Sequence, residues 1–322
     1  MRGRQSRQSS YRALCECEST IPLFSQAWWL DAAAGEEHWD VALVENGGQI
    51  LASMPYVLHS RKPLVLLGHP PLTQTLGPWF RDTGAKQATK LSRQKDWMER
   101  LIEALPHYDH FRQNWHHSQR NWAPFFWAGF VQTTRYTYRL RDLSDERELW
   151  ESLQPNIRRE IRKAQGRLNL RVRTDLGVRD FLKLNVQTFE RQGKGLPYSA
   201  GLVERLDAAC QRRRARQIFI AEDSEGRRHA GAYIVWDSNS AYYLMGGGDP
   251  ELRNSGATSL CVWESIRFAA TVTRSFDFEG SMIEPVERFF RAFGAEQTPY
   301  FAVSRTPSRF LRALLCVRGL LR

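Results

Sequence analysis

The sequence is short of cysteines and of long apolar runs, and each shortage excludes a class of protein. Its five cysteines are scattered, without the paired spacing of a zinc finger or a disulfide framework. No stretch approaches the roughly 18 consecutive apolar residues that a membrane span needs. The first ten residues are basic and rich in serine but lack the apolar core of a secretory signal, so we expect a disordered leader over residues 1–14 and a cytoplasmic protein.

The sequence also lacks the usual patterns of metal and covalent catalysis. Four histidines lie between residues 107 and 117, but no Cys or Glu constellation accompanies them, so we expect no metal. No Ser-His-Asp order is visible, and Cys261 falls on an apolar helix face. A reaction without a covalent enzyme intermediate is therefore the better expectation.

Positive charge is what the chain has in excess: 46 Lys and Arg against 35 Asp and Glu, a formal net charge of +11. Residues 157–173 hold seven basic residues and one acid, and residues 305–322 hold five arginines and no acid. Cations so placed favour phosphate-bearing partners such as nucleic acid, nucleotide cofactors and lipid headgroups. The alternatives are a solvated helix face for the first stretch and a helix packed on the first domain for the second.

At 322 residues the chain is long enough for two domains, and its halves repeat one order of expected elements: hairpin, strand, helix, strand. Asn46-Gly47 is the turn signal of the first hairpin. The first half has these elements at residues 39–57, 62–68, 91–105 and 107–115. The second half has them at residues 218–236, 241–245, 254–270 and 275–280. The repeat predicts an α+β protein of two similar units.

The run from Phe276 to Ser281 places two acidic side chains one residue apart. Apolar and acidic residues alternate in it, which predicts a short strand with Asp277 and Glu279 on one face, ended by Gly280. Two neighbouring carboxylates repel each other, and such a pair persists more readily where it faces cations or a substrate. Pairing with some of the many arginines is the alternative.

Four segments carry a family resemblance: Asn156–Ala164, the hairpin end Tyr242–Gly247, Asp277–Ser281 and Phe289–Gly294. In this order they resemble the FemAB-like branch of the GNAT superfamily, whose members add amino acids to peptidoglycan precursors. They also resemble the related BioF2-like acetyltransferase domains of surface-polysaccharide pathways. One departure is Phe290, which stands where the peptidoglycan members carry a lysine.

The resemblance implies two tandem GNAT-like domains, each a mixed, mostly antiparallel sheet flanked by helices. It also implies acyl or aminoacyl transfer to an amine bound between the domains. We place the domains at residues 15–144 and 145–304, followed by a basic amphipathic helix over residues 305–322.

The resemblance to GNAT enzymes implies that backbone N–H groups at a helix start hold the coenzyme A pyrophosphate, because unpaired donors and partial positive charge are concentrated there. A loop before an expected helix fits this in part, although Thr258 stands where glycine or alanine is usual. The residues expected to bind the donor are Gly247, Arg253, Asn254, Ser255, Gly256 and Ala257. A glycine-rich hairpin exit followed by an ordinary helix cap is the alternative.

Acyl transfer to an amine needs an acceptor for the amine proton and a donor to the leaving group. Asp277 and Glu279 are the candidates for binding the acceptor amine or hydroxyls, and Tyr243 is the candidate donor to the leaving group. The candidates for holding a substrate pyrophosphate or a tRNA acceptor stem are Arg158, Arg159, Arg162, Lys163 and Arg291.

We therefore expect an N-acyltransferase with an acyl-coenzyme A co-substrate and no tightly bound cofactor. Its acceptor would be an amine of a nucleotide- or lipid-linked amino sugar or peptide in a cell-envelope or surface-polysaccharide precursor. An aminoacyl-tRNA donor acting on a peptidoglycan precursor is one alternative, and a non-catalytic nucleic-acid-binding or scaffold protein is another. If the helix at residues 305–322 lies on an anionic membrane, the protein would be peripheral at its inner face.

Overall fold

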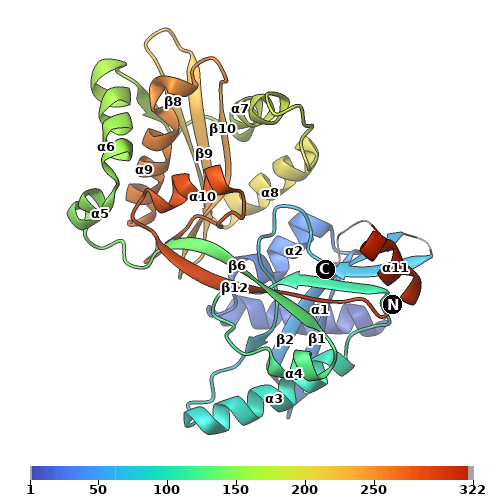
Figure 1. The fold of residues 1–322 in the computed structure, drawn as a ribbon. Helices are drawn as coiled ribbons and strands as arrows, with labels where there is room; N and C mark the ends of the chain where they lie inside the picture. The colour runs from blue at the N-terminus through green and yellow to red at the C-terminus, as the bar shows by residue number, and fades with distance from the viewer. Residues whose placement is uncertain (1, 62, 318–322) are drawn as a thin grey trace. The chain divides into compact units, whose positions relative to one another are not determined.

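The computed structural model describes residues 2–61 and 63–317, which form two compact units (Figure 1). Unit 1 runs to Arg135 and resumes at Pro299, and unit 2 is the continuous stretch between them. Two long strands, β6 (Val131–Leu140) and β12 (Glu296–Arg305), carry the chain from one unit into the other. The division thus falls earlier than the boundary we placed at residue 144, and unit 1 is completed by chain that follows unit 2.

The first residues form a helix, α1 (Arg2–Cys17), where we expected a disordered leader. Tyr11 and Leu14 are buried in the core of unit 1, and Arg7 forms an ion pair with Asp40. Serine and arginine dominate the composition of the segment, but its two large apolar residues, Tyr11 and Leu14, lie three apart and so share one helix face. That spacing, rather than the composition, explains why the segment packs.

Unit 1 is a sheet with helices on both faces. Its other elements are α2 (Ala27–Ala34), β1 (Trp39–Asn46), β2 (Gln49–Arg61), β3 (Leu64–Gly68), β4 (Trp79–Phe80), α3 (Gln87–Glu103), β5 (His110–Asn114), α4 (Ala123–Trp127) and α11 (Arg309–Val317). Strands β1, β2 and β3 are antiparallel neighbours, β3 and β5 are parallel, β5 and β12 are antiparallel, and β4 joins β2. The hairpin turn between β1 and β2 lies at Gly47 and Gly48, as Asn46-Gly47 predicted.

Alternation along β1 explains the two helical layers of unit 1. Val41 packs in a cluster with α1 and α2, whereas its neighbours Ala42 and Val44 pack in a second cluster with α3 and α4. Successive side chains of a strand point to opposite faces, so one apolar strand serves both clusters.

Unit 2 repeats this order. Its elements are α5 (Glu146–Ser152), α6 (Pro155–Arg162), β7 (Arg171–Arg173), α7 (Val178–Glu190), α8 (Ala200–Arg212), β8 (Arg216–Glu222), β9 (Arg228–Trp236), β10 (Ala241–Gly248), α9 (Ala257–Ala269), β11 (Phe276–Asp277) and α10 (Glu284–Arg291). Strands β8, β9 and β10 are antiparallel neighbours, β10 and β11 are parallel, β11 and β6 are antiparallel, and β7 joins β8. The predicted α+β class is therefore confirmed, and so is the repeated order of hairpin, strand, helix and strand.

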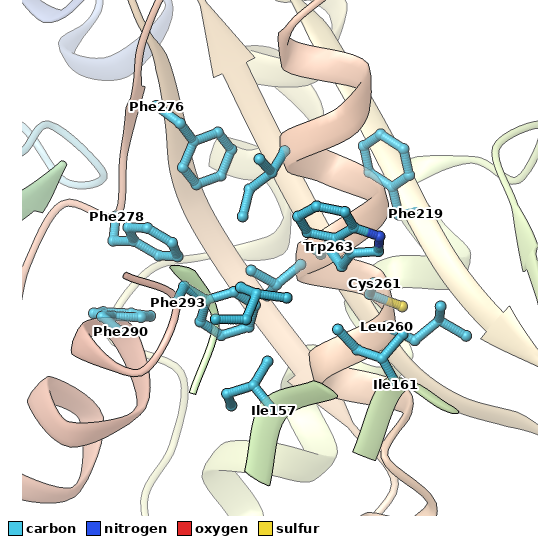
Figure 2. Packing of buried hydrophobic residues seen from close by; sticks show 14 of the residues in the cluster. Ile157, Ile161, Phe219, Leu260, Cys261, Trp263, Phe276, Phe278, Phe290 and Phe293 are labelled. Carbon is cyan, nitrogen blue, oxygen red and sulfur yellow. The ribbon is translucent and has the colours of Figure 1, made fainter. Parts of the chain in front are cut away.

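Helices cover both faces of the sheet in unit 2, with α6 and α9 on one face and α7 and α8 on the other (Figure 1). Figure 2 shows the core on the first face, where Ile161 of α6 and Leu260 of α9 pack near Phe219 of β8. Phe276 and Phe278 lie in the same core, with ring centroids 5.0 Å apart. This core fixes the start of α9 and the end of β11 relative to each other.

The helical stretch that opens unit 2 is split before Pro155: α5 ends at Ser152 and α6 begins at the proline. Asp145 is the N-cap of α5, and its carboxylate accepts from the backbone N–H groups of Arg147 and Glu148. At the other end of the chain, α11 lies within the stretch where we predicted a basic helix, and residues 318–322 lie outside the described part. Over the described residues, each helix is too short or too polar to cross a bilayer.

Candidate active site

The parallel strands β10 and β11 meet only at their first residues. Within the described chain, Ala241 lies opposite Phe276 and Tyr242 lies opposite Asp277, and there the pairing stops. Beyond this point β10 continues to Gly248, whereas the chain after Asp277 turns away. The two strands therefore diverge, and the candidate site lies where they part.

A left-handed turn causes the divergence. Glu279 and Gly280 have φ angles of +58° and +61°, a conformation that side chains other than glycine rarely adopt. A Cβ atom at Gly280 would lie 2.1 Å from the carbonyl oxygen of Tyr136, so only glycine fits there. The alternation that predicted a strand through residue 280 was thus misleading, because the strand ends at Asp277.

Asp277 holds this turn in place. Its carboxylate accepts from the Thr137 hydroxyl and, at 2.8 Å, from the backbone N–H of Glu279, and it lies 3.7 Å from Nε of Arg139. The residue is only 5% exposed, and burial raises the pKa of the carboxyl group above its usual value. Because several groups inside the protein bind its carboxylate, Asp277 is suited to hold its neighbours in place.

Glu279 is the second carboxyl group at the turn. Burial, reinforced by the negative charge of Asp277, raises its pKa well above that of an ordinary glutamate. A carboxyl group with a raised pKa takes up a proton near neutral pH more readily than an exposed one. Such groups are typical of functional sites, although structural networks also produce them.

The structure separates Tyr243 from the two acidic residues. Tyr242 is the register partner of Asp277 and shares its face of the sheet, so the next side chain, Tyr243, points to the opposite face. There the Tyr243 ring packs against Phe290, with ring centroids 5.8 Å apart. Burial raises the pKa of Tyr243, so its hydroxyl stays protonated and can donate a hydrogen bond.

The glycines that end β10 are covered by helix α7. A Cβ atom at Gly247 would lie 2.6 Å from the backbone nitrogen of Asn185, so the glycine permits a close helix–strand contact. The Asn185 side chain donates to the carbonyl of Gly246 at 2.7 Å, and the Thr188 hydroxyl accepts from the N–H of Gly248 at 2.9 Å. We expected these glycines to admit a ligand; in the structure a helix of the protein approaches Gly247 instead.

The predicted donor loop leads directly into α9. Arg253 and Asn254 are exposed, whereas Ser255, Gly256 and Ala257 are buried. Gly256 has a φ of +80° and is the N-cap of α9, and a Cβ atom on it would lie 2.3 Å from the carbonyl oxygen of Glu160. The loop and the basic helix α6, which were chosen separately from the sequence, are therefore in contact.

The predicted phosphate-binding residues have contacts within unit 2. Arg158 donates to the carbonyl of Glu151, and the guanidinium of Arg162 lies 5.6 Å from the ring centre of Trp150. Both contacts are therefore made with residues of α5. Arg159 and Lys163 form ion pairs with Glu160, the residue that touches Gly256. Arg291 forms an ion pair with Glu287, 2.9 Å away on the same helix. Of the five, Arg159 and Lys163 are thus the ones that pair with a residue in contact with the donor loop.

Phe290 is part of the core of unit 2. It is 6% exposed and packs on Phe278, with ring centroids 5.2 Å apart. A charged lysine at this position would need a route to water or a partner. The phenylalanine therefore serves packing here.

Sequence reasoning missed three residues of this site: Thr137, Arg139 and Tyr242. The first two lie on β6, which pairs with β11 through Leu140–Phe276 and Arg139–Asp277. The alternating arginines of residues 135–141 mark a strand, but nothing local assigns that strand to a segment far along the chain.

Comparisons with known proteins agree with this geometry. Residues 152–291 match the family model described as an acetyltransferase (GNAT) domain. Among solved structures the chain is similar to FemX, at 14% identity over 96% of this chain and 98% of that one, with a TM-score of 0.67. No curated protein sequence matches the chain.

Two further structures share the fold. The C-terminal DUF2156 domain of a putative lysylphosphatidylglycerol synthetase from Agrobacterium fabrum is 14% identical over 99% of both chains, with a TM-score of 0.55. L-PGS from Bacillus licheniformis is 10% identical over 98% of this chain and 96% of that one, with a TM-score of 0.52. Residues 152–291 thus match an acetyltransferase (GNAT) domain, and the whole chain is similar in fold to FemX.

Proposed function

We propose that the protein transfers an acyl group from an acyl-coenzyme A to an amine of an amino sugar or peptide in a cell-envelope or surface-polysaccharide precursor. The observation that carries the proposal is the divergence of β10 and β11 inside the GNAT domain, with Glu279 at the point where they part. In the proposal the donor lies along β10 and the acceptor amine meets its carbonyl near Glu279.

The donor side rests on two features. Between Tyr242 and Gly246 the edge of β10 has no β11 residue opposite it among the described residues, and an open strand edge pairs with extended, amide-bearing ligands. The pantetheine arm of coenzyme A is such a ligand. Its pyrophosphate would lie at the start of α9, where Arg253 and Asn254 are exposed and Arg159 and Lys163 are near.

The acceptor side rests on Glu279. In the reaction the amine nitrogen attacks the thioester carbonyl, the C–S bond breaks, and the amine proton passes to a base while the thiolate takes up a proton. Glu279 is the proposed base, because its raised pKa suits proton uptake near neutral pH. Asp277 is the proposed positioning residue, since it holds the N–H of Glu279. Tyr243, on the other face of the sheet, is the proposed donor to the leaving sulfur.

Similarity of the fold to FemX and to a domain of a putative lysylphosphatidylglycerol synthetase supports a second candidate. In it the donor is an aminoacyl-tRNA, and α6 contacts the acceptor stem through its basic side chains. The same fold accommodates both donors, so the donor has to be measured.

The test follows thiol release from acetyl- and longer acyl-coenzyme A in the presence of amino-sugar nucleotides and peptide amines. We expect Glu279→Gln to lower kcat by about a hundredfold or more with little change in folding. Glu296→Gln is the control, because Glu296 is half exposed and pairs with Arg141 on the surface of unit 2. Full activity of Glu279→Gln would remove Glu279 from the mechanism. Transfer from aminoacyl-tRNA without thiol release would establish the second candidate.

A further inference from the structure

An exposed aromatic patch lies on unit 1, whereas the residues assigned to acyl transfer belong to unit 2. Its members are Phe126 and Trp127 of α4 and Val131 at the start of β6, which are 60%, 64% and 57% exposed. Trp122 packs edge-on against Phe126, with ring centroids 5.5 Å apart. We refer to these four residues as the α4 patch. Large apolar side chains gathered in this way on a protein surface mark an interaction site.

The α4 patch is not needed to hold α4 in place. Phe125 and Phe130 directly precede the patch residues Phe126 and Val131, yet they are only 0% and 2% exposed. Their ring centroids lie 4.9 Å apart. They also contact Trp115 and Phe111 of the core. The inward face of the segment is therefore complete, and Phe126 and Trp127 contribute their apolar surface to the solvent side.

The charge around the α4 patch is of one sign along the chain. Within unit 1, residues 110–135 contain no acidic residue and three arginines. Arg120 from this stretch is exposed, and the guanidinium of Arg305 lies 5.3 Å from the ring centre of Phe130, the residue before Val131. Lys95 of α3 adds its ammonium group 5.7 Å from the ring centre of Trp127, although Glu99 lies 3.9 Å from the same group. The surroundings of the α4 patch thus favour a negatively charged partner.

We propose that the α4 patch inserts into the headgroup region of an anionic phospholipid bilayer. Tryptophan and phenylalanine partition into that region, and neighbouring Arg and Lys side chains are attracted by the negative surface potential of the lipids. An acidic protein partner would need an apolar groove that matches the α4 patch, whereas a bilayer takes up exposed aromatic side chains without a preformed groove. This surface is distinct from the C-terminal helix, and the inference does not depend on the proposed acyl transfer.

The test is flotation of the full chain with vesicles of phosphatidylcholine, alone or with about one third phosphatidylglycerol. We expect binding to the anionic vesicles, weakened at high salt, and a loss of about tenfold or more in the double variant Phe126→Ser, Trp127→Ser. Ile283→Ser is the matched control, because Ile283 is equally exposed, at 64%, but lies in unit 2. Phe310→Ser, on α11, tests the competing membrane surface.

A second measurement uses a variant that keeps the apolar surface. Brominated phospholipids quench tryptophans that enter the bilayer, so quenching should fall in Trp127→Phe relative to the original chain. Equal quenching in the two proteins, unimpaired flotation of the double variant, or no binding of the original chain to anionic vesicles would each overturn the proposal. A double variant that changes the oligomeric state but not lipid binding would show instead that the α4 patch joins two copies of the chain.

Discussion

At the scale of a single residue, His69 fixes a loop by remaining uncharged. The N–H of Asn114 donates to its Nε2 at 2.8 Å, so Nδ1 carries the proton and donates to the carbonyl of Thr73 at 3.0 Å. Protonation of Nε2 would break the first of these hydrogen bonds. Burial lowers the pKa of His69 from 6.5 to about 4.

This arrangement predicts a loss of stability in mild acid. Between pH 6.5 and pH 4 the unfolded chain binds a proton at His69 that the folded chain does not, so the free energy of unfolding falls as the pH falls. The full effect for one residue is about 3 kcal/mol. Urea unfolding of the original chain and of His69→Gln at several pH values measures it. His107→Gln, at an exposed histidine, should leave the pH dependence unchanged; a pH dependence equal in all three proteins would contradict the assignment.

At the scale of an element, α7 substitutes for a neighbouring strand at the end of β10. The Thr188 hydroxyl bonds both the N–H and the carbonyl of Gly248, at 2.9 and 3.3 Å. The Asn185 side chain donates to the carbonyl of Gly246. The last backbone groups of β10 are thereby satisfied where β11 has turned away.

Thr188→Val should therefore loosen the end of β10. The change keeps the size of the side chain but leaves the N–H of Gly248 without its acceptor, which costs about 1–3 kcal/mol. Hydrogen exchange at Gly248 should accelerate together with the fall in stability. Thr271→Val is the control, because the Thr271 hydroxyl bonds only a carbonyl on an exposed turn. Unchanged exchange at Gly248 would mean that the hydrogen bond contributes nothing.

The elements were predictable from the sequence to the extent that local chemistry determines them. Asn46-Gly47 acts on its neighbours and predicted the correct turn, and Pro155 begins a new helix for an equally local reason. The turn at Glu279 could not be predicted, because its left-handed backbone depends on Asp277 and on the close approach of Tyr136. The face of the sheet on which Tyr243 lies likewise followed only from the pairing of β10 with β11. The proposed roles of Asp277, Glu279 and Tyr243 in the reaction remain predictions.

At the scale of the whole molecule, the two units are not two successive pieces of chain. Ala302 to Arg305 pair with Phe111 to Asn114 in unit 1, and Val303 is fully buried in the cluster with α3. Unit 2 lies between these two strands in the sequence. No local sequence pattern indicates that β5 and β12 pair. For this reason we placed the two domains one after the other along the chain.

Residues 1–135 alone should consequently fail to form a stable fold, because β5 is left with an open edge and the core lacks Val303. Adding residues 299–317 as a separate chain should restore it. Circular dichroism and co-purification of the two pieces measure the effect. A second piece carrying Val303→Asp is the control and should not bind. Cooperative unfolding of residues 1–135 by themselves would show that β12 is dispensable.

The return of the chain to unit 1 also has a consequence for synthesis on the ribosome. Residues emerge in order, so unit 2 has all of its chain outside the tunnel before unit 1 has received its last strand. The second unit is thus free to fold first, while the first waits with β5 unpaired and its apolar residues accessible to chaperones. A pause in translation that holds residues 299–305 inside the tunnel would prolong the interval in which unit 1 lacks its last strand.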